Sequence, residues 1–569
     1  MLRSLSCLTR RFVPSSYLLS FSRGHHALAS MPNPPTDWNS HHEFFHLTSY
    51  RFVCDEKRQT AMRNVQFDMN SLAKIAAASI GFEECTDVKK LDEGLYNKVF
   101  LFTMEDGSQV VGKVPCRNAG RPHFTTASEV ATMDFVRTVL ETPVPKVLAW
   151  SSQASENNVG AEYIIMEKAH GIELIEKWPE MDISTRTKFL KSLARILKAW
   201  TSTSFSSYGS LYYPADLEDP KPCVLTKTDG SKIEEPRFAI GPSNSRMQSD
   251  DGRTAIDFDR GPWDTIEQYQ HAVAYREIAC VKNLTDLSLS KGALFGPRTF
   301  MPSRPKMLAA LQSFLQLIPF ILPTDSSISA PSLWHGDLHM RNILVNPEKP
   351  WQVQSLIDWQ FNALEPLFQH AVQPDFLTHD GPELEGLERP KFPENFNQMP
   401  AEEKQKAENI YYDQALVALY RTLVSIQIPV LYKAIEYRET TPFAIIRSSG
   451  LISKGCEAFY QTIVKDAKDT WSSIPGVQAA GNPEFPIHFF EDEICSIDKD
   501  MIETLLAISV MQNVKDVLGD RLMDHFEVWN QNYDEVKNLL AKCKTELMDG
   551  LGCAEDERRV WDKTWPFDE

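Results

Sequence analysis

The pattern of apolar and polar residues predicts a β-rich region in the first third of the chain. An apolar face at helical spacing near residues 67–80, with Asp68 or Asn70 as its cap, predicts a helix that precedes this region. The pair Asp106-Gly107 predicts a tight hairpin turn, because Asp-Gly readily adopts positive φ angles. Strands are predicted on both sides of this turn and further along, at 98–104, 109–114, 143–150 and 162–167.

Beyond residue 184 the apolar positions recur mainly at helical spacing. Six prolines between residues 365 and 400 exclude a continuous helix there. Residues 208–262 are polar and punctuated by Gly and Pro, which indicates either an acceptor-side insertion or a structural loop packed by Trp263. The acidic, Trp-containing C-terminus is expected on the surface. Helices are predicted at 184–200, 266–281, 306–322, 401–440, 501–518 and 526–548.

A polar loop flanked by short apolar strands is predicted within residues 333–345. Asp337 and Asn342 stand five residues apart in this loop, and Asp358 follows Asn342 by sixteen residues at the end of another apolar stretch. Phosphoryl-transfer enzymes of the kinase class use this arrangement to place a base and two Mg²⁺ ligands. In this interpretation Asp337 faces an acceptor hydroxyl, while Asn342 and Asp358 hold the metal that neutralises a triphosphate.

Lys113 lies among the valines of the second predicted hairpin strand. It either points to solvent from an edge strand or binds the α- and β-phosphates of a nucleotide. Glu129, which opens an apolar helix, favours the nucleotide, because a strand lysine paired with a helix glutamate is typical of phosphoryl-transfer lobes. Met166 and Glu167 end a strand where a hinge backbone would meet adenine. The pattern by itself indicates only a core strand, so this role depends on its position between the other parts. The stretch 93–98, with a single glycine, is compatible with a loop that covers phosphates.

Composition bounds the class of protein. A chain of 569 residues, 42% hydrophobic and 24% charged, is expected to form two or three folding units of ordinary globular balance. The net charge of −18 argues against nucleic acid as a partner. Ten scattered cysteines without a Cys-x-x-Cys pair favour free thiols in a reducing compartment. No window of about eighteen apolar residues is uninterrupted, so no transmembrane segment is predicted.

The N-terminus differs from the rest of the chain. Before Asp37 there is no acidic residue, whereas there are four arginines, and several apolar side chains can share one helical face. A basic, Ser-rich, amphipathic start is typical of a mitochondrial transit peptide, and the alternative is a disordered basic tail. We therefore predict a transit peptide with a linker at residues 1–36 and a mitochondrial location.

Two motifs carry a family resemblance. The loop His335-Gly336-Asp337-Leu338-His339-x-x-Asn342 resembles the catalytic loop of aminoglycoside phosphotransferases and choline kinases, and Ile357-Asp358-Trp359 resembles their metal-binding motif. The resemblance extends over about residues 40–560, and its motif pair is specific to the kinase-like fold rather than to a substrate. Further stretches are similar to a group of fungal mitochondrial proteins named for altered inheritance of mitochondria, namely 93–100, 128–133, 160–167 and 259–263.

The resemblance implies an α+β fold of the bilobal, protein-kinase-like type. A small β-rich lobe would bind ATP, and a larger, mostly helical lobe would carry the catalytic loop. The implied ligands are ATP, Mg²⁺ and a small-molecule acceptor that the sequence does not identify. The implied roles are a catalytic base at Asp337, Mg²⁺ ligands at Asn342 and Asp358, a phosphate clamp at Lys113 with its partner Glu129, a hinge at Met166 and Glu167, and a loop-bracing histidine at His335.

The sequence departs from the family pattern at several points. Gly112 stands where Ala is usual beside the strand lysine, and we expect the loss of one methyl group against adenine to be tolerated. Trp359-Gln360 replaces Phe-Gly after the metal-binding carboxylate, so flipping of the protein-kinase type is not expected. The phosphate loop has one glycine and the bulky Tyr96. No Ala-Pro-Glu follows, which argues against a protein substrate.

Three functions are compatible with these residues. The first is an ATP- and Mg²⁺-dependent phosphotransferase that transfers the γ-phosphate to a small-molecule hydroxyl in the mitochondrion, linked to mitochondrial inheritance or maintenance. The second is a nucleotide-binding pseudokinase scaffold, and the third transfers another part of the nucleotide, such as AMP. The predicted domains are the transit peptide and linker (1–36), an N-terminal helical extension (37–90), an ATP-binding lobe (91–170) and a helical lobe with insertions (171–569).

Overall fold

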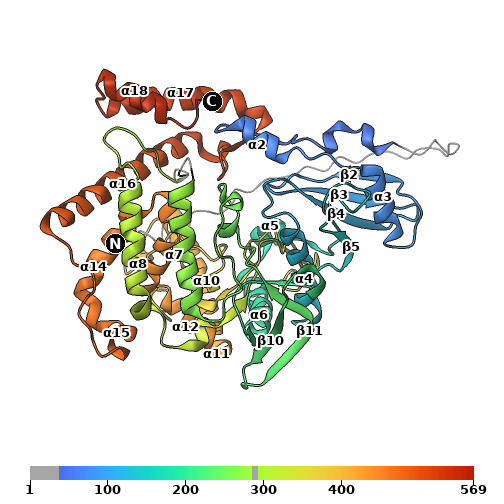
Figure 1. The fold of residues 1–569 in the computed structure, drawn as a ribbon, viewed down its shortest axis with the longest axis horizontal. Helices are drawn as coiled ribbons and strands as arrows, with labels where there is room; N and C mark the ends of the chain where they lie inside the picture. The colour runs from blue at the N-terminus through green and yellow to red at the C-terminus, as the bar shows by residue number, and fades with distance from the viewer. Residues whose placement is uncertain (1–36, 285–286, 288–291, 569) are drawn as a thin grey trace. The chain divides into compact units, whose positions relative to one another are not determined.

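The computed structural model describes residues 37–284, 287 and 292–568 (Figure 1). The predicted transit peptide therefore lies outside the described residues. The described chain divides into two units. We call residues 37–126, 147–168 and 509–568 the β-rich unit, and residues 127–146 and 169–508 the helical unit. The fold class is α+β, as predicted.

The β-rich unit is built on a five-stranded antiparallel sheet with the order β2-β3-β4-β6-β5. The hairpin between β3 and β4 turns at Gly107, whose φ of +83° lies in the left-handed region that glycine tolerates. The four strands predicted from hydrophobicity are confirmed, and β2 is an addition. The strands are β2 (Asp87–Lys90), β3 (Asn97–Thr103), β4 (Gln109–Pro115), β5 (Val147–Ser151) and β6 (Tyr163–Glu167).

One helix, α3 (Met69–Ala78), covers one face of this sheet (Figure 1). Asp68 caps its first turn, since Oδ1 accepts a hydrogen bond from the backbone N–H of Ser71 at 2.9 Å. Leu72 and Ala76 pack in the same buried cluster as Phe100. The predicted helix and its cap are therefore confirmed.

Segments from both ends of the described chain meet in the β-rich unit. Strand β1 (Tyr50–Phe52) pairs with β16 (Glu527–Trp529) in antiparallel register. The guanidinium of Arg51 lies 3.5 Å from the ring centroid of Tyr533. Trp561 and Trp565 are buried, whereas Glu555, Asp556 and Asp562 are exposed. The C-terminal segment therefore lies at the surface, as expected, with its tryptophans packed inward. The helices of these segments are α2 (Glu56–Arg63), α17 (Tyr533–Gly550) and α18 (Glu555–Thr564).

The helical unit contains most of the long helices. The predicted helices are confirmed with two changes: the stretch 401–440 divides at Pro429, and the last predicted helix starts at Tyr533 because strand β16 precedes it. Helices α4 (Phe124–Thr138) and α16 (Glu491–Leu518) continue from one unit into the other. The remaining helices of this unit are α5 (Leu174–Lys177), α6 (Ile183–Trp200), α7 (Ile266–Asn283), α8 (Arg304–Ile321), α9 (Ser326–Ser329), α10 (Leu367–His370), α11 (Ala401–Gln427), α12 (Pro429–Tyr437), α13 (Thr441–Ser449), α14 (Glu457–Ala467) and α15 (Pro475–Ala479).

Much of the segment predicted as a loop forms a second antiparallel sheet with the order β8-β10-β11-β9. The loop prediction for residues 208–262 is thus wrong over three strands, because the outer residues of β11 are polar and exposed and mask the alternation. Trp263 is buried as predicted, and its Nε1–H donates to Asp259 Oδ2 at 2.7 Å. The strands are β8 (Thr203–Phe205), β9 (Ser210–Tyr212), β10 (Lys221–Lys227) and β11 (Lys232–Gly241).

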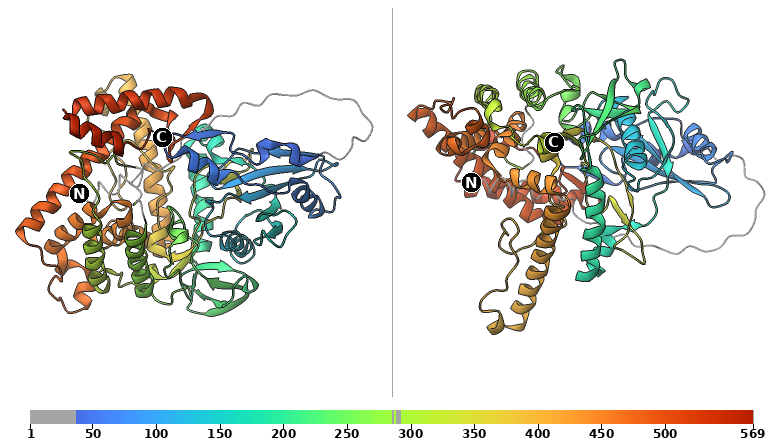
Figure 2. Two further views of the ribbon diagram at one scale, coloured as in Figure 1. Left: turned by 45° about the horizontal axis from the view of Figure 1, so that its top comes forward. Right: turned by 90° about the horizontal axis from the view of Figure 1, so that it is seen from below.

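Helix α11 projects from the helical unit, and the proline-rich chain before it folds back along its first half (Figure 2). Gln414 joins this proline-rich segment to α11, because its Nε2 donates a hydrogen bond to the carbonyl of Pro382 at 2.7 Å. Phe392 stacks on Tyr411 with ring centroids 4.1 Å apart. The exclusion of a continuous helix between residues 365 and 400 is confirmed.

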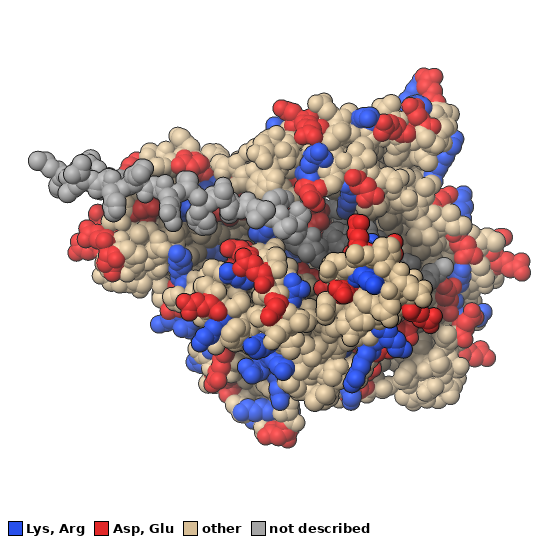
Figure 3. All heavy atoms as spheres, turned by 180° about the vertical axis from the view of Figure 1, so that it is seen from behind, with Lys and Arg blue, Asp and Glu red and all other residues tan. Residues whose placement is uncertain are grey.

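The apolar character of the described helices and the charges on one face of the molecule complete the description of the fold. Within 37–284 and 292–568, no helix combines the length and the apolar character that a bilayer crossing requires. On the face drawn in Figure 3, Lys and Arg side chains are mixed with Asp and Glu.

Candidate active site

The polar loop predicted within residues 333–345 lies between two short strands of the helical unit. One end of the loop continues from β12, which pairs with β15, and the other end enters β13, which pairs with β14 and β7. Both ends of the loop are therefore fixed by separate antiparallel ladders. The strands are β7 (Ile172–Glu173), β12 (Pro331–Leu333), β13 (Ile343–Val345), β14 (Val353–Leu356) and β15 (Leu364–Pro366).

His335 connects the loop to the end of β14. The imidazole is buried, its Nε2 lies 2.8 Å from the carbonyl oxygen of Ile357, and its ring meets Trp359 edge to face at 4.6 Å. The backbone N–H of Asp337 donates to Nδ1 at 3.2 Å, which places the ring proton on Nε2. Burial lowers the pKa of His335, so the ring is neutral and holds this tautomer.

Asn342 and Asp358 lie on neighbouring backbone segments. The backbone N–H of Ile357 donates to the carbonyl of Asn342 at 3.1 Å, directly beside Asp358. The Nδ2 of Asn342 donates to the carbonyl of Asp337 at 2.9 Å, which leaves Oδ1 as the ligand end of the amide. Asp358 has a φ of +67°, a left-handed conformation that is rare outside glycine and is found at functional sites.

Asp337 is the most accessible of the predicted residues in this loop. Its side chain is 65% exposed, and its Oδ2 lies 3.5 Å from Nε2 of His339. Burial alone would raise the pKa of Asp337, but the contact with His339 outweighs it and lowers that pKa. Burial would lower the pKa of His339, and the charge of Asp337 raises it instead. The carboxylate of Asp337 is therefore ionised at neutral pH and faces solvent.

The donor chemistry of this site fits Mg²⁺. Asn342 and Asp358 offer an amide oxygen and a carboxylate, and Mg²⁺ is usually held by one or two such ligands together with water and phosphate oxygens. The site does not resemble a transition-metal centre: among the described residues, no group of three or more His, Cys, Asp or Glu side chains is arranged to hold a metal ion. The backbone hydrogen bond from Ile357 to Asn342 keeps the two oxygen ligands on adjacent segments.

Lys113 lies in the β-rich unit on β4, a central strand that pairs with both β3 and β6. It stands opposite Val99 on one side and Ile164 on the other, and it is only 7% exposed. The alternative of a solvent-facing lysine on an edge strand is therefore wrong. A buried lysine in the middle of a sheet needs an anionic partner. Its predicted contact with the nucleotide phosphates stays a prediction.

The other predicted nucleotide contacts lie on helix α4 and strand β6. Glu129 is buried on α4, and its pairing with Lys113 stays a prediction. Met166 and Glu167 end β6 and are half-buried, with Met166 opposite Val111 in the sheet. Their contact with adenine also stays a prediction.

Gly112 does not share a face with Lys113, because side chains alternate along a strand. A Cβ atom on Gly112 would lie 2.5 Å from Cε2 of Phe102 and 3.0 Å from Cδ1 of Ile165. Glycine at this position therefore makes room for Phe102 in the core on the opposite face. The expectation that the missing methyl group belongs against adenine is wrong.

Comparison with known proteins decides the family. The model of the phosphotransferase enzyme family matches residues 87–369, a range that contains every predicted site residue. A subtelomeric hrmA-associated cluster protein of Aspergillus fumigatus is 34% identical over 357 residues, which cover 58% of this chain and 67% of the relative. The chain belongs to the phosphotransferase enzyme family.

Further relatives and one solved structure extend the comparison. The mitochondrial altered inheritance of mitochondria protein 9 of Yarrowia lipolytica is 25% identical, with 81% of each chain covered. The predicted mitochondrial location is confirmed by several relatives that carry this name. Among solved structures, a putative aminoglycoside phosphotransferase of Ralstonia eutropha has a TM-score of 0.35 and 14% identity, with 79% of this chain and 99% of that chain covered.

Two residues of the candidate site were not predicted from the sequence. Asn362 accepts a hydrogen bond from the backbone N–H of Gly336 at 2.8 Å and donates to the carbonyl of Trp359 at 3.0 Å. It thereby joins the loop to the segment after Asp358, and only its position four residues beyond that carboxylate could have indicated it. Asp375 has a buried Oδ1 without a hydrogen-bond partner among the described residues, and its charge acts on His339.

Proposed function

We propose that this chain is an ATP- and Mg²⁺-dependent phosphotransferase that transfers the γ-phosphate to a hydroxyl of a small molecule in the mitochondrion, with a role in mitochondrial inheritance or maintenance. Family membership supports phosphoryl transfer as the reaction class. The observation that carries the proposal is the hydrogen-bonded set around His335: this one ring contacts the backbone of Asp337 and of Ile357, the residue before Asp358.

Asp337 orients the acceptor in this mechanism. Its exposed carboxylate accepts a hydrogen bond from the acceptor hydroxyl. As the hydroxyl oxygen bonds to the γ-phosphorus, the bond from that phosphorus to the β,γ-bridging oxygen breaks, ADP leaves, and the hydroxyl proton passes to Asp337. Because the pKa of Asp337 is lowered, the proton transfers late, when the oxygen has already bonded to phosphorus.

The remaining residues hold the donor. Asn342 and Asp358 would bind Mg²⁺, which when bound neutralises charge on the triphosphate. Lys113 would hold the α- and β-phosphates, and Glu129 would fix that lysine. The two hydrogen bonds of His335 fix the backbone at Asp337 and at Ile357, the residue before Asp358. In this mechanism the ring of His335 transfers no proton.

A metabolite panel tests this proposal. The purified full-length chain is incubated with ATP, Mg²⁺ and candidate alcohols, and the products are identified by mass spectrometry. We expect a phosphorylated product, ATP consumption that is lost on chelation and restored by Mg²⁺, and a fall in kcat of about 10² to 10⁴-fold in Asp337→Asn. The exposed Asp219 provides the matched control, and Asp219→Asn should retain full activity.

Each other result has a defined meaning. ATP consumption that is unaffected by Asp337→Asn would reject the assignment of the base. Stabilisation by ATP without turnover on the whole panel would favour the pseudokinase scaffold. A product that carries AMP in place of phosphate would identify transfer of the other part of the nucleotide.

A further inference from the structure

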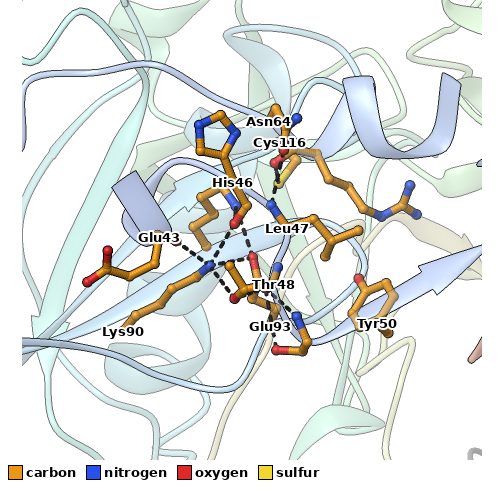
Figure 4. Close-up of polar contacts among 12 residues, drawn as sticks. Glu43, His46, Leu47, Thr48, Tyr50, Asn64, Lys90, Glu93 and Cys116 are labelled. Atoms are coloured by element: carbon orange, nitrogen blue, oxygen red, sulfur yellow. Dashed lines mark hydrogen bonds and ion pairs between the residues drawn. The ribbon is translucent and has the colours of Figure 1, made fainter. Parts of the chain in front are cut away.

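A buried ionic cluster lies beneath the loop between β2 and β3 in the β-rich unit (Figure 4). The carboxylate of Glu93 is 3% exposed, and its Oε1 lies 2.8 Å from Nζ of Lys90 and 2.9 Å from Nζ of Lys98. Its Oε2 accepts hydrogen bonds from the backbone N–H and the hydroxyl of Thr48 at 2.7 and 3.0 Å. The N-terminal segment before β1 is thereby joined to the loop.

The two lysines are fully used inside this cluster. Lys90 Nζ also donates to the carbonyls of Glu43 and His46, both at 2.7 Å, and Lys98 Nζ donates to His46 at 3.0 Å. Burial alone would raise the pKa of Glu93, but the two lysines and the N–H of Thr48 lower it to about 2. The carboxylate of Glu93 is therefore ionised at neutral pH. Lys98, at 1% exposure, is a structural residue rather than a phosphate ligand.

The backbone of the loop is held at three successive carbonyls. The Tyr50 hydroxyl donates to Gly94 at 3.1 Å, the Asn118 side chain donates to residue 95 at 3.0 Å, and the Cys116 N–H donates to residue 96 at 2.8 Å. A loop with one glycine and three anchored carbonyls has little conformational freedom. Its shape is thus set before any ligand arrives.

The anchoring reaches the C-terminal segment. The Nδ2 of Asn530 donates to the carbonyl of Thr48 at 2.7 Å, and Tyr50 stands opposite Trp529 in the β1–β16 pair. The residues that grip the loop are therefore themselves held by a strand from the far end of the described chain.

We propose that segment 43–50, Lys90, Glu93 and Lys98 form a clasp that holds loop 93–97 in the conformation that receives the nucleotide triphosphate. The inference rests on the proposed function. Glu93 and Tyr50 are positioning residues, because they act on the loop backbone and not on the phosphates. Glycine-rich phosphate loops bind the triphosphate through close backbone contacts, whereas this loop has one glycine. A preformed loop compensates, because less conformational entropy is lost when the triphosphate binds.

Two variants of the full chain test the clasp. Tyr50→Phe removes one hydrogen bond to the loop and keeps the aromatic ring, and Glu93→Gln removes the central charge. We expect the Kd of a non-hydrolysable ATP analogue with Mg²⁺, measured by calorimetry, to rise about fivefold in Tyr50→Phe and more in Glu93→Gln. Adenosine, which lacks the phosphates, should bind both variants as it binds the wild type.

Tyr437→Phe is the matched control. It removes a hydrogen bond of 2.7 Å from the Tyr437 hydroxyl to the carbonyl of Ile321 in the helical unit. The substitution should therefore lower the free energy of unfolding about as much as Tyr50→Phe does, without a change at the loop. Equal ATP-analogue affinity in wild type and Tyr50→Phe would overturn the clasp, as would an equal loss in Tyr437→Phe. A wild type that binds neither the analogue nor adenosine would instead refute the proposed function. Faster amide exchange over residues 93–97 in Tyr50→Phe alone supports the clasp.

Discussion

Glu457 is a carboxyl group that the fold buries at the start of α14. Its Oε1 accepts a hydrogen bond from the backbone N–H of Ser303 at 2.8 Å, whereas Oε2 has no hydrogen-bond partner among the described residues. Burial raises the pKa of Glu457 to about 7, against an ordinary value of 4.5. The folded chain therefore keeps this proton at pH values where the unfolded chain has lost it.

The raised pKa predicts how one substitution changes stability with pH. Because the folded state binds the extra proton between about pH 4.5 and 7, the contribution of Glu457 is fully present below that range and is lost as pH rises through it. In Glu457→Gln, which keeps an oxygen acceptor for Ser303, the free energy of unfolding relative to wild type should rise over this range, by up to about 3 kcal/mol. Urea unfolding at pH 5 and pH 8 measures the difference.

The exposed Glu484 provides a comparison for that measurement. Glu484→Gln should change stability equally at both pH values, because its carboxylate is solvated in the folded and unfolded states. A Glu457→Gln variant with the same relative stability at pH 5 and pH 8 would show that Glu457 titrates normally in the folded protein.

At the scale of elements, strand β4 serves two purposes on its two faces. Gly112 admits Phe102 to the core on one face, while Lys113 lies on the other. We predict that Gly112→Ala lowers the free energy of unfolding by about 1 to 3 kcal/mol, because the added methyl group overlaps the ring of Phe102. Denaturant unfolding at neutral pH measures the loss.

A second substitution separates the clash from other effects of alanine in a strand. Phe102→Leu removes the ring atoms that the new methyl group would meet, so Gly112→Ala should cost less in the Phe102→Leu background than in the wild type. Additive losses in the double variant, or a Gly112→Ala protein as stable as wild type, would contradict this account of Gly112.

Elements with several residues of one period were predictable from the sequence. Helices α3, α6, α7 and α8 and the hairpin of β3 and β4 each have enough apolar positions to reveal their spacing. Strands β1, β8, β9 and β16 have three residues each, too few to show alternation, and the pairing of β1 with β16 depends on residues remote in sequence. A local sequence pattern cannot predict that two strands so far apart in sequence will pair.

The same distinction applies to the candidate site. Asp337, Asn342 and Asp358 were predictable because their spacing follows from one loop and one hairpin. Asn362 was not, because its role depends on how the chain turns after β14. Glu93 lies in a stretch read as a phosphate cover, and only the folded chain shows that its carboxylate points inward to two lysines.

At the scale of the whole molecule, charge is distributed unevenly along the sequence. The net charge is −18, yet residues 1–36 contain four arginines and no acidic residue. We predict that residues 1–36 direct a fused fluorescent protein to mitochondria, because the membrane potential draws a basic amphipathic segment inward. Fluorescence microscopy of cells with a mitochondrial marker measures the location.

Two sets of substitutions define the cause. Replacing Arg3, Arg10, Arg11 and Arg23 by Gln should leave the fusion outside mitochondria, whereas replacing them by Lys should preserve import, since the charge is kept. Import of the Gln variant would show that charge is not the signal and would favour a disordered basic tail.

The pairing of β1 with β16 also bears on the timing of folding during synthesis. Strand β1 leaves the ribosome early, whereas its partner emerges only after the intervening helical unit has been made. Until residue 529 has left the ribosome, the backbone groups of β1 that pair with β16 have no partner strand, and the β-rich unit stays incomplete. If the chain enters a narrow translocation channel N-terminus first while it is being synthesised, the β-rich unit has therefore not yet completed its fold.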